Sequence, residues 1–255
     1  MYKMKASISF ENRKFLVTGA SSGLGRTVSI DLAQKGATLV ITGRSEEELK
    51  KTISLMDGVK HTFYPCKLDE EHDLTVFFNR IVSDGVKLSG IVHCAGLIPL
   101  TPVNTLKRDK IVQCMGINFY ALIELIRCFS KSKFHTDKAS IVEISSISSL
   151  YPGKCQTIYA ASKAAANAAV QAMAIELAPK GIRVNSVLPG IIDTPATHLA
   201  IRSLGEEIHD KTLSNQLHGL IPMGEISDVV TFLLSDLSSA ITGRTIFADG
   251  GYIDF

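Results

Sequence analysis

Seven short apolar runs alternate along this chain with longer segments of helical pattern, and this alternation restricts the fold more than any other feature. Several runs are apolar at nearly every position, which is typical of strands covered on both faces of a parallel sheet. The alternation predicts an α/β protein with a Rossmann-type, doubly wound parallel sheet of about seven strands and helices on both faces. The expected strands are Phe15–Thr18, Thr38–Thr42, His61–Tyr64, Ile91–His93, Ile141–Ile144, Arg183–Val187 and Thr245–Ala248. The expected helices are Leu24–Gln34, Glu46–Met56, Glu70–Ser83, Arg108–Lys131, Gln156–Ala178 and Ser227–Leu234.

No linker-like stretch divides the 255 residues, so residues 1–255 are expected to form one domain. The alternation is interrupted only at 195–220, a long insertion between the sixth strand and the last helix. Insertions of this length are typical of lids and binding segments, and we expect this one to cover a substrate. In a doubly wound sheet, ligands bind beyond the carboxyl ends of the strands.

Charge and composition argue against several classes of protein. Lys and Arg total 27 against 25 Asp and Glu, with neither sign in long blocks, so a nucleic-acid or anionic membrane surface is not expected. No stretch reaches the roughly 18 uncharged apolar residues of a membrane span, and the N-terminus lacks the apolar run of a signal peptide. The five widely spaced cysteines are typical of reduced thiols in a cytoplasmic protein. The seven histidines show no metal-binding spacing, so no metal site is expected.

A glycine-rich turn follows the first strand and leads directly into the first helix. Its glycines, Gly19, Gly23 and Gly25, stand in the order Gly-x-x-x-Gly-x-Gly. Glycine permits a tight turn and lets backbone N–H groups approach a pyrophosphate, while the helix N-terminus adds positive dipole character there. With a strand before it and a helix after it, this turn predicts a dinucleotide-phosphate site. Its contacts are expected from residues 19–25, in particular Gly19, Ser21, Ser22, Gly23, Leu24 and Gly25.

This glycine order, together with Tyr159-Ala-Ala-Ser-Lys163, resembles the short-chain dehydrogenase/reductase family from about Lys14 to Tyr252. Ser146 lies thirteen residues before Tyr159, as in the family, and Asn118 matches the family's asparagine in the long fourth helix. The segment from Pro189 to Thr194 resembles the one that holds the nicotinamide, with Gly190 and Ile192 inside it, and residues 241–251 resemble the family's C-terminal signature. The resemblance implies cofactor contacts from Ala95, Gly96, Tyr159, Lys163, Pro189, Gly190, Ile192 and Thr194.

The resemblance also implies the catalytic residues. On a helix, Tyr159 and Lys163 are neighbours at i and i+4. Tyrosine has an ordinary pKa of about 10, and a nearby ammonium favours the phenolate, which brings the group toward useful acid–base strength. Ser146 would hydrogen-bond the substrate oxygen. Lys163 would also bind the nicotinamide ribose, and Asn118 would hold a water that relays protons to Lys163.

Two positions depart from the family's pattern. After the fourth strand the family has Asn-Asn-Ala-Gly, whereas this chain has His93-Cys94-Ala95-Gly96, so two amide side chains are lost. Near the third strand, Lys67 stands where an adenine-contacting aspartate is common, and Asp69 is the candidate substitute. Neither departure is expected to affect the reacting atoms.

The end of the second strand favours NADP(H) over NAD(H). An NAD-preferring site offers an acid there to the ribose hydroxyls, but this chain has Gly43 followed by Arg44. A guanidinium suits a 2′-phosphate. Glu46 lies two residues further on, so NAD(H) remains open.

These observations predict a single dinucleotide-binding oxidoreductase domain that interconverts a ketone and a secondary alcohol, with Tyr159 as general acid and base. The alternatives are an NAD(H)-dependent alcohol dehydrogenase, a 3-oxoacyl-carrier-protein reductase, and a non-catalytic dinucleotide-binding regulator. Ser146, Tyr159 and Lys163 together argue against a regulator, since a binder needs no such set. The apolar circumference of the two long helices, Arg108–Lys131 and Gln156–Ala178, predicts a homo-oligomer, a tetramer or a dimer.

Overall fold

The computed structural model describes residues 8–58, 60–68, 74–194, 197–198 and 215–252. Its seven strands form one parallel sheet in the order β3-β2-β1-β4-β5-β6-β7, which confirms the doubly wound α/β fold. The chain order reverses between β1 and β4, where such sheets bind ligands. The strands are β1 (Lys14–Thr18), β2 (Thr38–Gly43), β3 (Thr62–Pro65), β4 (Leu88–His93), β5 (His135–Ile144), β6 (Ile182–Pro189) and β7 (Thr245–Ala248).

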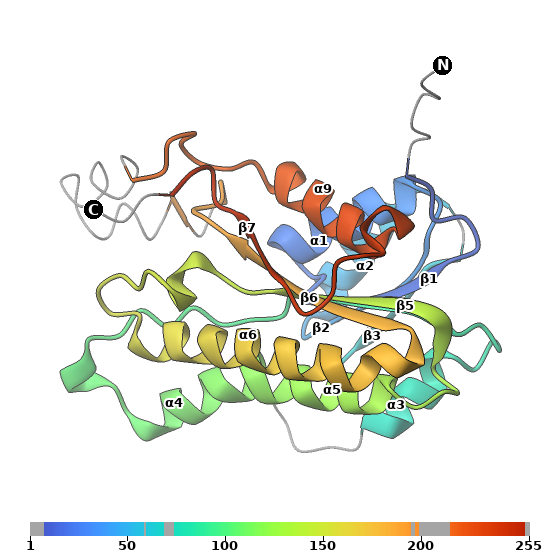
Figure 1. Cartoon of the computed structure of the whole chain (residues 1–255), viewed down its shortest axis with the longest axis horizontal. Helices are drawn as coiled ribbons and strands as arrows, with labels where there is room; N and C mark the ends of the chain where they lie inside the picture. Colours follow the sequence, from blue (N-terminus) through green and yellow to red (C-terminus); the bar gives the residue numbers. More distant parts are fainter. Residues whose placement is uncertain (1–7, 59, 69–73, 195–196, 199–214, 253–255) are drawn as a thin grey trace.

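Two layers of helices cover the sheet (Figure 1). One layer holds α1 (Gly23–Gln34), α2 (Glu46–Ser54) and α9 (Met223–Leu234). The other holds α3 (Leu74–Ile81), α4 (Arg108–Met115), α5 (Ala121–Phe129) and α6 (Thr157–Leu177). With both faces covered, the central strands bury almost every residue, and all five residues of β1 are buried. This burial explains why the strands lack apolar–polar alternation.

The expected fourth helix is interrupted. Between α4 and α5 the chain makes a π-helical turn, η2 (Gly116–Tyr120), instead of continuing as one α-helix. A π-turn adds one residue to the helical repeat, and such turns occur often at functional sites. Here it contains the buried Asn118.

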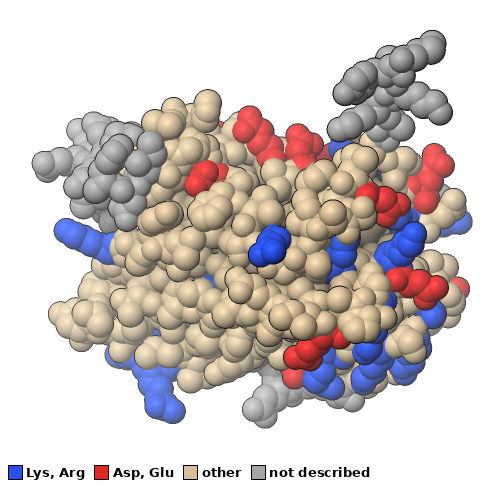
Figure 2. Space-filling view, in the orientation of Figure 1, with Lys and Arg blue, Asp and Glu red and all other residues tan. Residues whose placement is uncertain are grey.

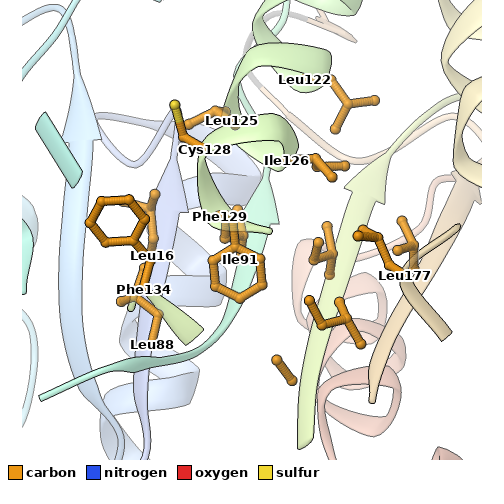
Figure 3. Close-up of a cluster of buried hydrophobic side chains, with 14 of the residues drawn as sticks. Leu16, Leu88, Ile91, Leu122, Leu125, Ile126, Cys128, Phe129, Phe134 and Leu177 are labelled. Carbon is orange, nitrogen blue, oxygen red and sulfur yellow. The ribbon is translucent and has the colours of Figure 1, made fainter. Parts of the chain in front are cut away.

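The same stretch, Arg108–Phe129, is long and apolar enough to cross a membrane by length and mean hydropathy (1.4), with 44% of its window buried inside the protein. The residues of α5 that face inward pack on the sheet as part of its core, as in a helix of a globular fold. Figure 3 shows Leu122, Leu125, Ile126 and Phe129 directed toward the strands. The face of the molecule in Figure 2 carries basic and acidic side chains interspersed over its right half.

The face of the sheet toward α5 and α6 is layered by residue type. Neighbouring strands place one apolar residue each in a row across the sheet, in the order Val40, Leu16, Ile91, Ile141, Val184. Two residues further along each strand, on the same face, lies a second and polar row. We call it the polar row; it consists of Thr42, Thr18, His93, Glu143 and Ser186, all fully buried. The apolar core therefore ends one layer below the carboxyl edge of the sheet.

Candidate active site

The glycine turn after β1 is built around very close backbone contacts. A Cβ on Gly25 would lie 2.4 Å from the carbonyl oxygen of Gly19, and a Cβ on Gly19 would lie 2.7 Å from the backbone nitrogen of Ala95. The first helix and the segment after β4 therefore pack directly on the turn. Gly23, at a φ of +52°, has open space around its Cβ position. The turn thus has a closely packed backbone at Gly19 and Gly25 and open space at Gly23. A dinucleotide pyrophosphate needs such space to approach the backbone N–H groups.

Arg26 fixes this turn to α2. Its guanidinium donates to the backbone carbonyl of Ser21, to the Glu48 carboxylate at 2.7 Å and to the Thr52 hydroxyl at 3.0 Å. The neighbouring Ser22 is the N-cap of α1, and its side chain makes no capping hydrogen bond. The hydroxyl of Ser22 and the first N–H groups of α1 are therefore available to an anion.

Arg44 follows β2 and is exposed, and the acids around it are engaged elsewhere. Glu46 pairs with Lys50 at 2.8 Å, and Glu47 pairs with Lys51 at 3.1 Å. Within the residues that the structure describes, Arg44 forms no ion pair. A Cβ on Gly43 would lie 3.1 Å from the Ser21 hydroxyl, so an acidic side chain at position 43 would press on the turn.

Three of the expected catalytic residues lie on α6 and in the segment that follows β5. Tyr159 and Lys163 are buried on α6, which its alanine-rich sequence favours. Ser146 begins the short helix η3 (Ile147–Ser149) directly after β5. Its hydroxyl oxygen accepts a hydrogen bond from the Ser148 backbone nitrogen at 3.1 Å, which leaves the hydroxyl hydrogen available to donate.

Asn118 connects three elements. Its Oδ1 accepts from the Leu97 backbone nitrogen at 2.8 Å, while its Nδ2 donates to the Leu97 carbonyl at 3.0 Å and to the Ser162 hydroxyl at 2.9 Å. Both amide hydrogens are thus used within the protein, so a relay water would need another group, such as the main chain of the π-turn. Asn118 also lies near Lys163, because a Cβ on Gly96 would be 3.3 Å from Asn118 Oδ1 and 3.8 Å from Lys163 Nζ.

Sequence reasoning missed Glu143, which binds Lys163 from beneath. Lys163 Nζ donates to Glu143 Oε1 at 2.9 Å and to the Ile144 carbonyl at 2.6 Å. Burial raises the pKa of the Glu143 carboxyl to about 7, although the ammonium beside it acts in the opposite direction. The pKa of Lys163 is raised by the charge of Glu143, against the effect of burial. The available signal was one charged residue inside the apolar run Ile141–Ile144, since a buried charge requires a partner.

The departure at His93 lies closer to this chemistry than expected. His93 pairs in register with Glu143 on the next strand, and its Nε2 lies 4.0 Å from Glu143 Oε2. Burial and the nearby ammonium lower the pKa of the His93 imidazole to about 3, so the ring is neutral. Burial raises the pKa of the adjacent Cys94 thiol. His93 thus faces the carboxylate that holds Lys163, so this departure lies one residue away from an expected catalytic side chain.

The segment after β6 is anchored by a second residue that sequence reasoning missed. Gln216 accepts from the Ile191 backbone nitrogen at 2.7 Å and donates to the Ile191 carbonyl at 3.0 Å. The contact is close, because a Cβ on Gly190 would lie 2.2 Å from Gln216 Oε1. Ile192 bridges to Ile221, and the Thr194 hydroxyl meets that of Thr197 at 2.8 Å.

Other expectations fall partly or wholly outside the described residues. Of the insertion at 195–220, residues 195–196 and 199–214 lie outside, and so do Asp69 and the expected start of the third helix at 70–73. The remaining site residues meet at the carboxyl edge, where Gly19, Ala95, Ser146 and Pro189 end or follow β1, β4, β5 and β6. The open space at Gly23 fits a dinucleotide along this edge.

Known proteins resemble this chain over nearly its whole length. A family model described as enoyl-(acyl carrier protein) reductase matches residues 19–253. The 3-oxoacyl-(acyl-carrier-protein) reductase FabG of Thermotoga maritima is 30% identical over 251 residues, which cover 95% of this chain and 98% of the relative. Glucose 1-dehydrogenase of Gluconobacter oxydans is 30% identical over 262 residues, with 96% and 95% covered.

Solved structures agree with this result. A short-chain type dehydrogenase/reductase from Mycobacterium ulcerans has a TM-score of 0.85 and 28% identity, with 95% of this chain and 90% of that chain covered. The fold, the glycine turn and the similarity over nearly the whole chain together are stronger evidence for a family than a short motif that could arise by chance. The chain therefore belongs to the short-chain dehydrogenase/reductase family and is an NAD(P)-dependent oxidoreductase that acts between CH–OH and C=O groups.

Proposed function

We propose that this protein is an NADP(H)-dependent oxidoreductase that interconverts a ketone and a secondary alcohol, with Tyr159 as general acid and base. The observation that carries the proposal is the burial of Tyr159 and Lys163 on α6, together with the hydrogen bond from Asn167 Nδ2 to Ser149 Oγ at 2.9 Å, which joins this helix to the segment that begins at Ser146. Burial acts to lower the Lys163 pKa, but the charge of Glu143 and then that of Tyr159 raise it, so the ammonium and the Tyr159 hydroxyl lie within electrostatic reach of each other.

In the reduction, Tyr159 donates a proton to the carbonyl oxygen while Ser146 donates a hydrogen bond to it. The bound dinucleotide supplies the hydride to the carbonyl carbon in reduction and accepts it in oxidation. Lys163 favours the phenolate that remains on Tyr159. The glycine turn, Ala95, Gly96 and the segment from Pro189 to Thr194 orient the cofactor, and Arg44 binds its 2′-phosphate. Gly19, Ser21, Ser22, Gly23, Leu24 and Gly25 bind the pyrophosphate.

Tyr159→Phe tests the mechanism, because it removes one hydroxyl and leaves the ring in place. General acid catalysis contributes about 10²–10⁴-fold, so turnover should fall at least about 100-fold. Dinucleotide binding, measured by fluorescence titration, should persist. A variant that keeps more than about a tenth of the wild-type rate would show that the proton comes from another group.

Arg44→Ala tests the cofactor preference. A charged hydrogen bond to phosphate contributes about 1.5–3 kcal/mol, so the NADPH-to-NADH ratio of kcat/KM should fall by about 10–100-fold. Lys138→Ala is the matched control, since it removes one exposed positive charge from the far end of β5. An unchanged ratio in Arg44→Ala would leave NAD(H) as the cofactor of choice.

Two features support the preference for NADP(H) over NAD(H). Glu46, the first acid in the sequence after β2, is engaged by Lys50 at 2.8 Å. Position 43 lacks space for a side chain that would bind ribose hydroxyls without pressing on Ser21. Freeing Glu46 by Lys50→Ala should therefore move the preference toward NADH.

The remaining candidate functions differ in the substrate on which the enzyme acts. FabG of Thermotoga maritima is a 3-oxoacyl-carrier-protein reductase and the Gluconobacter relative is a glucose dehydrogenase, so an acyl thioester and a sugar are both represented at equal identity. A panel of simple ketones, sugars and 3-oxoacyl thioesters, assayed by NADPH and NADH consumption, distinguishes them. No turnover of any member of the panel, with dinucleotide binding intact, would place the substrate outside these three classes.

We further propose a cytoplasmic homo-oligomer, a tetramer or a dimer. Much of the apolar surface of the long helices is buried within the subunit, but Val112, Tyr120 and Ile175 are 57%, 54% and 78% exposed. Such residues on α4, η2 and α6 favour subunit contact. Light scattering at micromolar concentration should return a multiple of the 27.6 kDa chain mass. A one-chain mass would contradict the assembly.

A further inference from the structure

Glu143 is a carboxyl group without exposed surface, placed under the proposed catalytic pair. It lies on β5 between His93 on β4 and Ser186 on β6, which are its register partners in the sheet. Its Oε1 accepts from Lys163 Nζ at 2.9 Å. Its Oε2 and the neighbouring Ser186 Oγ have no hydrogen-bond partner among the described residues. Burying a charged carboxylate costs free energy unless the carboxylate is paired and hydrogen-bonded. Here only Oε1 has a hydrogen-bond partner among the described residues.

The hydrogen bonds around His93 determine which of its nitrogens carries the proton. Thr18 Oγ1 accepts from the Ala95 backbone nitrogen at 3.2 Å and lies 2.9 Å from His93 Nδ1. If the Thr18 hydroxyl donates to Nδ1, the proton of the neutral ring is on Nε2, which faces Glu143 Oε2 at 4.0 Å. The other tautomer would turn a bare nitrogen toward a carboxylate oxygen. The first arrangement therefore fits both residues, and the two unpartnered atoms, Nε2 and Oε2, face each other.

We propose that Glu143 is a positioning residue for Lys163. Its carboxylate, supported from the other side by His93, holds the ammonium at the floor of the site and reduces the positive field that Lys163 exerts on Tyr159. The inference rests on the proposed roles of Tyr159 and Lys163. In this arrangement His93 and Cys94 stand where the family has two amide side chains, and the neutral imidazole of His93 faces the buried Glu143 carboxyl.

The charges that face Glu143 come from three elements. Lys163 and Tyr159 approach from α6, His93 and the Cys94 thiol from β4 and the residue after it, and β6 contributes only the neutral Ser186. The imidazole is neutral near pH 7, because burial lowers its pKa to about 3. Near pH 7 the net charge of Glu143 and Lys163 therefore changes between zero and +1 as the carboxyl, with its pKa of about 7, takes up a proton.

The first test uses the protein without cofactor. In protein labelled with ¹³C at the glutamate carboxyls, the Glu143 resonance is the one that Glu143→Gln removes. It should titrate with a midpoint near pH 7 instead of near 4.5. In Lys163→Met the midpoint should move to higher pH, because the ammonium that favours the carboxylate is gone. A midpoint that Lys163→Met leaves in place would overturn the proposal, because the carboxyl would then not feel the ammonium.

The second test follows the pH profile of alcohol oxidation, in which Tyr159 must accept a proton. Glu143→Gln keeps the shape of the side chain but removes its charge, so the phenolate sees a stronger positive field. The acid limb of kcat should move to lower pH by at least about half a unit. Glu143→Asp retains the charge and should leave the limb near its wild-type position while lowering kcat. A limb that stays in place in Glu143→Gln, or moves to higher pH, would refute the positioning role.

Ser186→Ala is the matched control for both measurements. It removes a buried, unpartnered hydroxyl from the same polar row, next to Glu143 but without contact to Lys163. Its pH profile should match that of the wild type. Failure of the proposed function is distinguishable from failure of this inference. In the first case Tyr159→Phe would remain active, whereas in the second Tyr159→Phe is inactive and the Glu143 midpoint is the same in Lys163→Met as in the wild type.

Discussion

Gly25→Ala should lower the stability of this enzyme and weaken its cofactor site, because there is no room for a methyl group between α1 and the glycine turn. The new methyl group would lie 2.4 Å from the Gly19 carbonyl oxygen and 2.7 Å from its carbonyl carbon. Ordinary contacts of a carbon atom lie at about 3.5 Å, so helix α1 and the turn must separate by about 1 Å. Neither partner is the flexible end of a side chain, because both are backbone.

The expected cost follows from this displacement. Overpacking a tight contact costs about 1–3 kcal/mol, which for a chain of this length lowers Tm by roughly 2–4 °C per kcal/mol. The displaced N–H groups should also weaken NADPH binding by about tenfold or more, since a shift of about 1 Å exceeds what a hydrogen bond tolerates. Thermal unfolding and fluorescence titration with NADPH measure the two effects.

Gly224→Ala provides the opposite control. Gly224 is in the first turn of α9, and its Cβ position has no atom within 4 Å. Alanine there removes the conformational freedom of glycine without a clash and should stabilise the protein by up to about 0.5–1 kcal/mol. If Gly25→Ala unfolded at the wild-type temperature and bound NADPH equally well, the reasoning from backbone contact would be refuted.

Three further predictions follow from other contacts. His93 has a pKa lowered from 6.5 to about 3, so the unfolded chain binds the proton first and the free energy of unfolding should fall as pH drops from about 6.5. Urea denaturation between pH 4 and 7 checks this sign. The free energy of unfolding should change less steeply with pH in His93→Asn than in the wild type. Lys14→Met should lower stability by about 1–3 kcal/mol, because the buried ammonium donates to the Ile81 carbonyl at 2.6 Å; an unchanged urea midpoint would count against it. Ser146→Ala should reduce kcat by about 10–1000-fold while NADPH affinity stays near wild type, and equal losses in both would indicate a structural role.

The strands, the order of the elements and the position of the glycine turn could be predicted from the sequence because they depend on local patterns. Apolar runs such as Ile91–His93 and the spacing of Tyr159 and Lys163 are visible without any partner. The structure places the strands within three residues of the expected ends, except that β5 begins at His135 instead of Ile141.

The contacts that could not be predicted depend on register between strands. Nothing near Glu143 in the sequence indicates that it faces His93, 50 residues earlier, because that pairing is set by the alignment of β4 with β5. The π-turn at Asn118 was also missed, since Gly116–Tyr120 fits an ordinary helix by composition. Both features arise where tertiary packing overrides local preference.

The polar row has a consequence for how enzymes of this shape can differ from one another. Each of its side chains is sealed from solvent, so a substitution that adds or removes a charge there changes the electric field at the reacting atoms without altering any surface that a substrate touches. Two proteins with the same serine, tyrosine and lysine, and the same pocket outline, can therefore work best at different pH values. Selectivity for the substrate and response to acidity are then set by separate groups of residues, one above the carboxyl edge of the sheet and one within it.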